Sequence, residues 1–226
     1  AISIFYSALA TAYKKKDRSS SSSDSLNFEY LDLSVKNYKK AYSLNQHKQD
    51  DEEILNISKY LTNLGKDSMK RDELNQSMQY LSKANEYSPD YSTTNFYMGN
   101  LYMKIQDYEL AIKSYEKGLG SRMKSGNYKV LYLLGSCYQR LGNLDMAKQL
   151  FEYSLINEMS YTKARFALAN VLYAQHNYDE SKQYLLEIID NESSYIKAYE
   201  LLVNLFLDTK DYNKAREYSL IGIDIN

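Results

Sequence analysis

The sequence predicts an all-α fold, a solenoid built from antiparallel helix pairs. Two observations lead to this fold class. Apolar residues recur three and four positions apart along most of the chain, which is the spacing of one face of an α-helix. Stretches with this pattern also recur with a period of about 34 residues, and a repeat period of this length is typical of stacked helical repeats. The composition agrees, because the 226 residues include one proline and eight glycines, and 44% are hydrophobic.

The clearest unit is the range Thr162–Tyr195, which contains two amphipathic helices and a polar turn. In its first half, the apolar residues Phe166, Leu168, Val171 and Leu172 include spacings of three and four, which indicate an apolar face of a helix. The residues Asn177-Tyr178-Asp179 interrupt this pattern with types that favour turns and helix starts, and a second apolar face follows. A pair of short helices cannot bury both faces by itself. We therefore expect each pair to pack against its neighbours.

Copies of this unit lie before and after it. The range Ile196–Asn226 follows one repeat period later and aligns with it without a gap. Upstream, the same offset places Gly135 and Ala147 opposite Ala169 and Ser181. We predict five units in one continuous solenoid, with the ranges 58–91, 92–127, 128–161, 162–195 and 196–226.

The apolar and small residues of these units resemble the tetratricopeptide repeat (TPR) family. The family is marked by a 34-residue helix–turn–helix with a Leu-Gly pair, a tyrosine, alanines, an aromatic residue and a proline at fixed places. One unit carries Leu134-Gly135, Tyr138, Ala147 and Phe151 at those places, and another carries Leu64-Gly65, Leu81, Ala84 and Pro89. The chain departs from the pattern in having no tryptophan and in placing Ser68 where an aromatic residue is usual. The resemblance implies a right-handed superhelical solenoid of about six helix pairs.

The range 1–57 is predicted to be a degenerate first repeat. We expect its helices at 1–13 and Tyr30–Leu44, separated by an insertion at about 17–27 that contains the serine run Ser19–Ser23. A serine run cannot bury apolar surface, so we expect a mobile loop there. The charged stretch His47–Glu53 is interpreted as a linker. It could also extend the next helix at its start, where unpaired backbone N–H groups favour acidic residues.

The sequence contains no convergent set of catalytic or metal-binding residues, so we predict a non-enzymatic protein without a cofactor or a metal. The two histidines, His47 and His176, do not have the spacing of metal ligands to each other or to Cys137. Cys137 stands beside the core position Tyr138, and we expect a packed, unreactive thiol. The net charge is −1 with acidic and basic residues interspersed, which gives no electrostatic reason to expect nucleic acid or an anionic membrane. No apolar run of about 18 residues predicts a membrane span.

The resemblance implies a groove on the concave side of the solenoid, where the first helix of each unit lies in this family. Equivalent positions on successive first helices are then expected to face a partner. The predicted partner-binding groove residues are Phe96, Asn100, Met103, Tyr132, Ser136, Gln139, Phe166, Asn170, Tyr173, Glu200 and Asn204. Aromatic side chains supply contact area at low entropic cost, and asparagine can both donate to and accept from a peptide backbone. The alternative is that some of these aromatic residues fill the space between helices.

We therefore expect a protein–protein interaction scaffold that holds a peptide or a helix of a partner protein in the groove. One alternative is a regulatory or assembly arm of a larger protein or complex whose activity lies outside this chain. Another is an RNA-binding helical repeat, which the length of the repeat period and the net charge disfavour. Chaperone-binding members of the family hold a C-terminal carboxylate with lysine, asparagine and arginine side chains. The corresponding places do not provide that set, because they hold Phe96, Leu133, Phe166 and Leu201.

The C-terminal end carries more apolar residues than a solvated last helix requires. Leu220, Ile221, Ile223 and Ile225 all stand close together there. We expect them to be covered by self-association through the C-terminal helix or by a capping segment further along the chain, unless some of them point inward. The sequence indicates neither the partner nor the compartment, for which the cytoplasm and the cell envelope both stay open.

Overall fold

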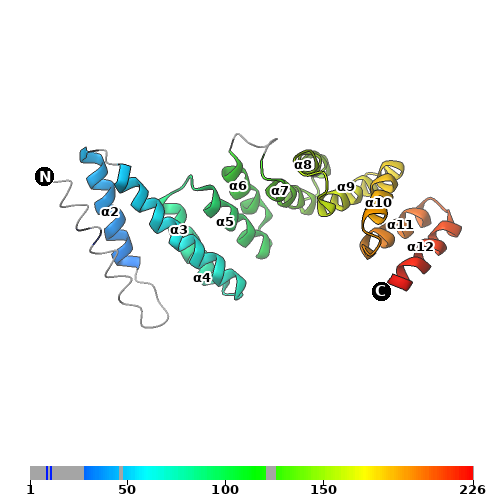
Figure 1. The fold of residues 1–226 in the computed structure, drawn as a ribbon, viewed down its shortest axis with the longest axis horizontal. Helices are drawn as coiled ribbons and strands as arrows, with labels where there is room; N and C mark the ends of the chain where they lie inside the picture. Colours follow the sequence, from blue (N-terminus) through cyan, green and yellow to red (C-terminus); the bar gives the residue numbers. More distant parts are fainter. Residues whose placement is uncertain (1–8, 10, 12–27, 46–47, 121–125, 226) are drawn as a thin grey trace. The chain divides into compact units, whose positions relative to one another are not determined.

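The computed structural model describes residues 9, 11, 28–45, 48–120 and 126–225, and all the regular structure in this part of the chain is α-helical (Figure 1). This confirms the predicted all-α fold of antiparallel helix pairs. The helices are α2 (Phe28–Asn45), α3 (Lys48–Lys70), α4 (Leu74–Tyr87), α5 (Ser92–Lys104), α6 (Tyr108–Leu119), α7 (Tyr128–Arg140), α8 (Leu144–Asn157), α9 (Thr162–Ala174), α10 (Tyr178–Asn191), α11 (Ile196–Asp208) and α12 (Tyr212–Ile225).

The chain divides into two compact units, Ala1–Leu101 and Tyr102–Asn226, and the division falls inside α5. In the first unit, α3 packs against both α2 and α4. Its core includes the buried Val35 of α2, Leu61 of α3 and Ala84 of α4. A polar contact also joins α2 to α4, because the carboxylate of Asp32 accepts a hydrogen bond from Tyr87 Oη at 2.6 Å. All three described helices before α5 are thus held together by one core.

The helix α3 is longer than the sequence suggested. It begins at Lys48, so the expected linker forms its first turns and the expected boundary at Ser58 lies within a continuous helix. The alternative reading of this stretch, a helix extension, is the correct one. Asp50 and Asp51 stand in the first turn, where unpaired backbone N–H groups stabilise negative charge. The expected insertion at about 17–27 and most of the expected helix before it lie outside the described residues.

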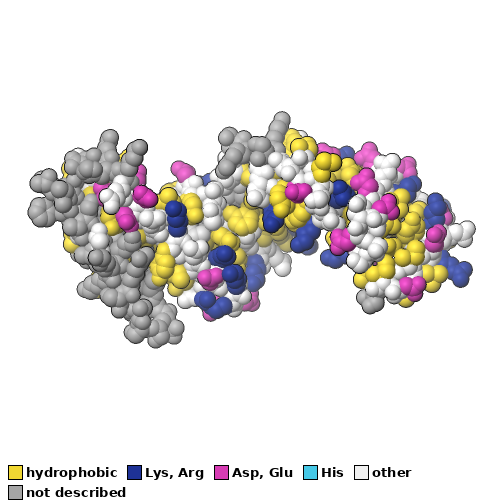
Figure 2. Space-filling model, in the orientation of Figure 1, with side chains coloured by type: hydrophobic (Ala, Val, Ile, Leu, Met, Phe, Trp, Pro, Cys, Tyr) yellow, Lys and Arg dark blue, Asp and Glu magenta, His cyan; other side chains and the backbone are white. Residues whose placement is uncertain are grey.

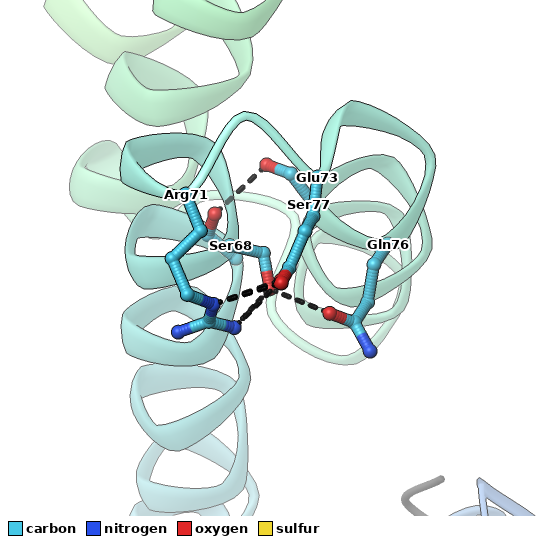
Figure 3. A network of polar contacts seen from close by, with 6 residues as sticks. Ser68, Arg71, Glu73, Gln76 and Ser77 are labelled. Carbon is cyan, nitrogen blue, oxygen red and sulfur yellow. Dashed lines mark hydrogen bonds and ion pairs between the residues drawn. The ribbon is translucent and has the colours of Figure 1, made fainter. Parts of the chain in front are cut away.

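A polar network holds the turn between α3 and α4 (Figure 3). The buried Ser68 donates its hydroxyl to Gln76 Oε1 at 3.1 Å and accepts from Arg71 Nη2 at 3.3 Å. The Arg71 guanidinium also donates to the Glu73 carboxylate, with Nη2 2.7 Å from Oε2, and this bond lowers the pKa of Glu73. The network therefore satisfies the serine hydroxyl that replaces the family's aromatic residue.

The second unit contains three complete helix pairs, and the helices of each pair pack against each other: α7 with α8, α9 with α10, and α11 with α12. The pairs also pack against one another, through α8 on α9 and α10 on α11. The first helices begin at Tyr128, Thr162 and Ile196, which are each one repeat period apart. Side chains separated by one repeat period therefore occupy equivalent places on successive pairs.

From α3 onward, the turn inside each described helix pair contains one residue in the left-handed region of the backbone. These residues are Asp72 (φ 67°), Gln106 (φ 64°), Gly142 (φ 78°), His176 (φ 62°) and Lys210 (φ 62°). The next residue donates its backbone N–H back to the first helix, as Asn177 does to Leu172 O at 2.8 Å. A Cβ atom is unfavourable at positive φ, so Gly142 suits the turn best. The shared geometry gives every turn the same length.

The helices of a pair cross closely where both carry small residues. Ser181 Oγ on α10 donates to Ala169 O on α9 at 2.8 Å, and both residues are fully buried. At the equivalent place on α7, a Cβ atom on Gly135 would lie 2.7 Å from Cε1 of Phe151. Phe151 is itself fully buried, so its ring has little room to move aside.

Replacing Gly135 by alanine should destabilise the protein by about 1–3 kcal/mol, because the added methyl group overpacks this crossing. Gly222→Ala is a matched control. A Cβ atom there would meet Tyr199 Cβ at 3.5 Å, an ordinary contact, and alanine favours a helix over glycine by about 1 kcal/mol. Urea unfolding followed by circular dichroism would measure both variants. If Gly135→Ala proved as stable as the wild type, the close crossing would not be a constraint on this fold.

Candidate partner-binding face

The predicted groove residues of α7, α9 and α11 share one side of the second unit. α9 contacts both α7 and α11, and residues spaced by three and four along each helix point to the same side. We call this surface the first-helix face. It consists of Tyr132, Ser136, Gln139, Phe166, Asn170, Tyr173, Glu200 and Asn204. All of these residues are half-buried or exposed, so each retains some accessible surface.

The three predicted residues on α5 are placed differently. Phe96 and Asn100 fall in the first unit, where the Phe96 ring packs edge-on against Tyr97 with the centroids 5.2 Å apart. Met103 falls in the second unit, and its sulfur accepts a hydrogen bond from the Cys137 thiol at 3.0 Å. Met103 therefore joins the end of α5 to α7.

The aromatic residues of the first-helix face also pack against neighbouring elements. The Tyr132 ring lies 5.4 Å from the Tyr161 ring and 5.9 Å from the Phe151 ring. The Phe166 ring lies 5.5 Å from the Tyr195 ring, which is the equivalent contact one repeat later. Part of each ring therefore fills the space between helices, as the alternative interpretation expects, while the rest of the ring stays accessible. Sequence reasoning missed Tyr161 and Tyr195, although their separation by one repeat period was the signal that could have found them.

Two polar members of the face are already engaged. Ser136 donates its hydroxyl to Tyr132 O within its own helix at 2.8 Å. Tyr173 on α9 donates its hydroxyl to Asp208 Oδ2 on α11 at 2.6 Å. This hydrogen bond, and to a lesser extent burial, raises the pKa of Tyr173 to about 12. The bond bridges two successive first helices and fixes the orientation of the Tyr173 ring.

The other polar members have no partner in the described part of the chain. Gln139, Asn170, Glu200 and Asn204 form no side-chain hydrogen bond or ion pair with any described residue. Their amide and carboxylate groups are available to a ligand. They stand beside half-exposed aromatic rings on three consecutive first helices.

A row of lysines borders the first-helix face and was also missed from the sequence. Lys129, Lys163 and Lys197 are exposed in the first turns of α7, α9 and α11, again one repeat period apart. Each precedes the first face residue of its helix by three positions, so the lysine lies on the same side. Helix N-termini disfavour positive charge, so the helix dipoles do not account for these lysines. The Lys129 ammonium lies 5.6 Å from the centroid of the Tyr128 ring.

The described residues do not form a metal-binding cluster. No three histidine, cysteine, aspartate or glutamate side chains among them could hold a metal ion together. Cys137 is fully buried, and this burial raises the pKa of its thiol to about 12. His176 is exposed in a turn, where its Nδ1 lies 2.8 Å from Tyr178 Oη, and His47 lies outside the described residues. None of the described helices is long and apolar enough to cross a membrane.

The stacked helix pairs and their shared face define a helical-repeat protein of the solenoid class. Family models described as tetratricopeptide repeat match residues 94–122, 128–154 and 166–220. The chain belongs to the tetratricopeptide repeat family, whose members typically mediate protein–protein interactions.

Solved structures share this fold. MamA from Desulfovibrio magneticus RS-1 is 15% identical, with a TM-score of 0.69 over 74% of this chain and 94% of that chain. YrrB is 22% identical (TM-score 0.65, 84% of this chain and 92% of that chain), and its structure is described as a TPR protein with an unusual peptide-binding site. PilF of Pseudomonas aeruginosa is 18% identical (TM-score 0.64, 78% of both chains). At these identities the likeness establishes the fold alone. A comparison with curated protein sequences gives no significant match.

Asp208→Asn should lower the pKa of Tyr173 from about 12 towards the ordinary tyrosine value of about 10, because the carboxylate charge is removed. A raised tyrosine pKa favours the protonated folded form. The stabilising effect should therefore be present below about pH 10 and be lost as the pH rises through about 12. NMR titration of 13C-labelled tyrosine, assigned with Tyr173→Phe, would measure this pKa. An unchanged pKa in the variant would show that the bond to Asp208 is not its cause.

Proposed function

We propose that the chain is a non-enzymatic scaffold that holds a peptide or a helix of a partner protein against the first-helix face. The observation that carries this proposal is the set of four polar side chains without internal partners on three consecutive first helices. None of the four belongs to the buried core, so the packing of the fold does not require polar groups there. The peptide-binding site described for YrrB, a protein of the same fold, supports the same kind of function.

The chemistry of the face suits a polypeptide ligand. The amides of Asn170 and Asn204 can each donate to and accept from a peptide backbone. Tyr132 and Phe166 offer rigid apolar area, which costs little conformational entropy on binding. The lysine row, Lys129, Lys163 and Lys197, favours a partner segment with acidic residues through longer-range attraction.

The double variant Phe166→Ala with Asn170→Ala should bind its partner at least about tenfold more weakly, because it removes an aromatic anchor and a hydrogen-bonding amide together. The helical content should be unchanged, and the loss of stability should be about 1–2 kcal/mol because Phe166 is only half-buried. Quantitative affinity capture from source lysate, with circular dichroism on the same samples, would measure both effects.

The matched control is Gln149→Ala with Gln183→Ala, two residues at equivalent places on the second helices α8 and α10 that keep part of their surface accessible. This control should capture the same proteins as the wild type. If the Phe166→Ala, Asn170→Ala variant captured every protein that the wild type captures, and with the same affinity, all partners would bind another surface and the proposed site would be refuted.

We also propose that the chain self-associates through α12. Leu220, Ile221 and Ile223 are 53%, 38% and 67% exposed, so three of the four apolar residues at this end do not point inward. Together α11 and α12 line an open groove of about 530 Å³ that includes Ile223 and Gly222.

The preceding helix pair, α9–α10, shows what covers the equivalent surface one repeat earlier, because α11 packs there. There, Leu185 and Ile188 stand at the places of Ser219 and Gly222, and both are buried in the core that α11 completes. The groove between α11 and α12 thus has the form of a site for another helix. It also includes Glu200 and Asn204, so an occupant would cover the end of the first-helix face.

Replacing Leu220 and Ile223 by glutamate should keep the protein monomeric, because charged side chains cannot be buried in this apolar contact without large cost. The wild type should show a weight-average mass that rises with concentration in sedimentation equilibrium. A wild-type protein that stays strictly monomeric at high concentration would refute self-association.

A further inference from the structure

A second groove lies between α8, α9 and α10 and has no role in the function proposed above. Its volume is about 630 Å³. Leu155 of α8 and Leu168 of α9 contribute to its apolar lining, and Ile156 and Met159 stand at the end of α8 and in the turn that follows. All of the groove belongs to the second unit, whose surface carries apolar side chains in several places (Figure 2).

The groove is on the opposite side of α9 from the first-helix face. Leu168 is two residues from both Phe166 and Asn170, which corresponds to about 200° around an α-helix. A ligand in this groove would therefore contact neither Phe166 nor Asn170. The two surfaces can be tested separately.

Ile156 and Met159 are the most exposed large hydrophobic residues in the described part of the chain, at 73% and 75%. Single exposed apolar residues are ordinary, but these two line the same groove beside further apolar side chains. The exposed apolar surface of Ile156 and Met159 therefore lies together in this groove.

The other repeats show that the fold does not need apolar residues at these two places. The next repeat has Asp190 and Ser193 there, and the 58–91 repeat has Glu86 and Pro89. The helix pairs α9–α10 and α3–α4 pack normally with those residues. The apolar pair is thus a feature of one repeat and not a requirement of stacking.

The accessible charge around the groove is negative. Glu152 lines it and forms no hydrogen bond or ion pair with any described residue. The one cation in its described lining, Arg165, is only 16% exposed and is held inside, with Nη2 donating to Met159 O at 2.6 Å and Nε 3.5 Å from Glu187 Oε2. Burial raises the pKa of Tyr184, which also lines the groove, and the nearby carboxylates of Glu152 and Glu187 raise it further.

We propose that this groove is a second docking site, for a segment of a partner protein that presents a large apolar side chain next to a lysine or arginine. The apolar side chain would cover Ile156 and Met159, and the cation would lie against Glu152. Charge complementarity is the reason for choosing this partner, because an acidic or a purely apolar segment would leave the Glu152 carboxylate repelled or unpaired.

The test uses the full chain and a phage-displayed library of random short peptides. Binders are selected on the wild type and then sorted on the double variant Ile156→Asp with Met159→Ser. This variant installs the residues of the next repeat, so it should fold, and circular dichroism would verify this. We expect a class of peptides that is lost on this variant and is enriched in lysine or arginine beside a large apolar residue.

Individual peptides of this class should bind the Ile156→Asp, Met159→Ser variant at least about tenfold more weakly. Glu152→Gln should weaken them by about threefold at low salt, and their binding to the wild type should fall as salt rises. The Phe166→Ala, Asn170→Ala variant should bind them as the wild type does, which separates this site from the first-helix face.

Three results would overturn the proposal. One is a selection in which no binder depends on Ile156 and Met159. Another is a dependent class of peptides without enriched lysine or arginine. The third is a concentration-dependent mass of the wild type that Ile156→Asp with Met159→Ser abolishes, since the occupant would then be a second copy of this chain.

Discussion

The close crossing of the two helices within each pair is the constraint on which the rest of the structure depends. Helices of 13 and 14 residues, such as α9 and α10, are too short to be stable in isolation. Contacts at the crossing hold the helices of a pair together. In the α7–α8 pair, Gly135 lets α7 lie against the Phe151 ring, and in the α9–α10 pair Ser181 Oγ donates a hydrogen bond to Ala169 O. A larger residue at these crossings would separate the helices. The crossing therefore fixes how each first helix is turned, and with it which side chains face outward.

The left-handed turns repeat that arrangement along the chain. Because one residue with positive φ joins the helices of every described pair from α3–α4 onward, each second helix starts at the same point relative to the first. Gly142 adopts this conformation without strain, while His176 and Lys210 adopt it at some cost in stability. The turn is thus maintained by the packing of the pair rather than by the residue in it. Equal turns and equal crossings place residues one repeat period apart in equivalent surroundings, which is what makes an extended recognition surface possible.

The sequence predicted the helix pairs that repeat, and it missed contacts that depend on how different helices are placed. The repeat period located the first helices, since apolar spacing and small residues recur with it. It did not reveal that α3 starts at Lys48, because a helix start composed of charged residues has no apolar face to detect. It placed Tyr173 on the face, but the hydrogen bond to Asp208 joins two different helices and needs their relative position. The exposure of Ile156 and Met159 also depends on neighbouring helices that the sequence does not place.

Two surfaces of different chemistry share α9 as their common wall. On one side are amides and half-exposed aromatic rings beside a row of lysines, and on the other are apolar side chains beside unpaired carboxylate charge. Between them, Leu168, Val171 and Leu172 are buried to 1% exposure or less, so the wall is a packed core and not a flexible layer. We therefore expect that a ligand bound at one of the two surfaces leaves the structure of the other unchanged. The two proposed sites differ in charge, and both can be filled together because the core between them is already packed.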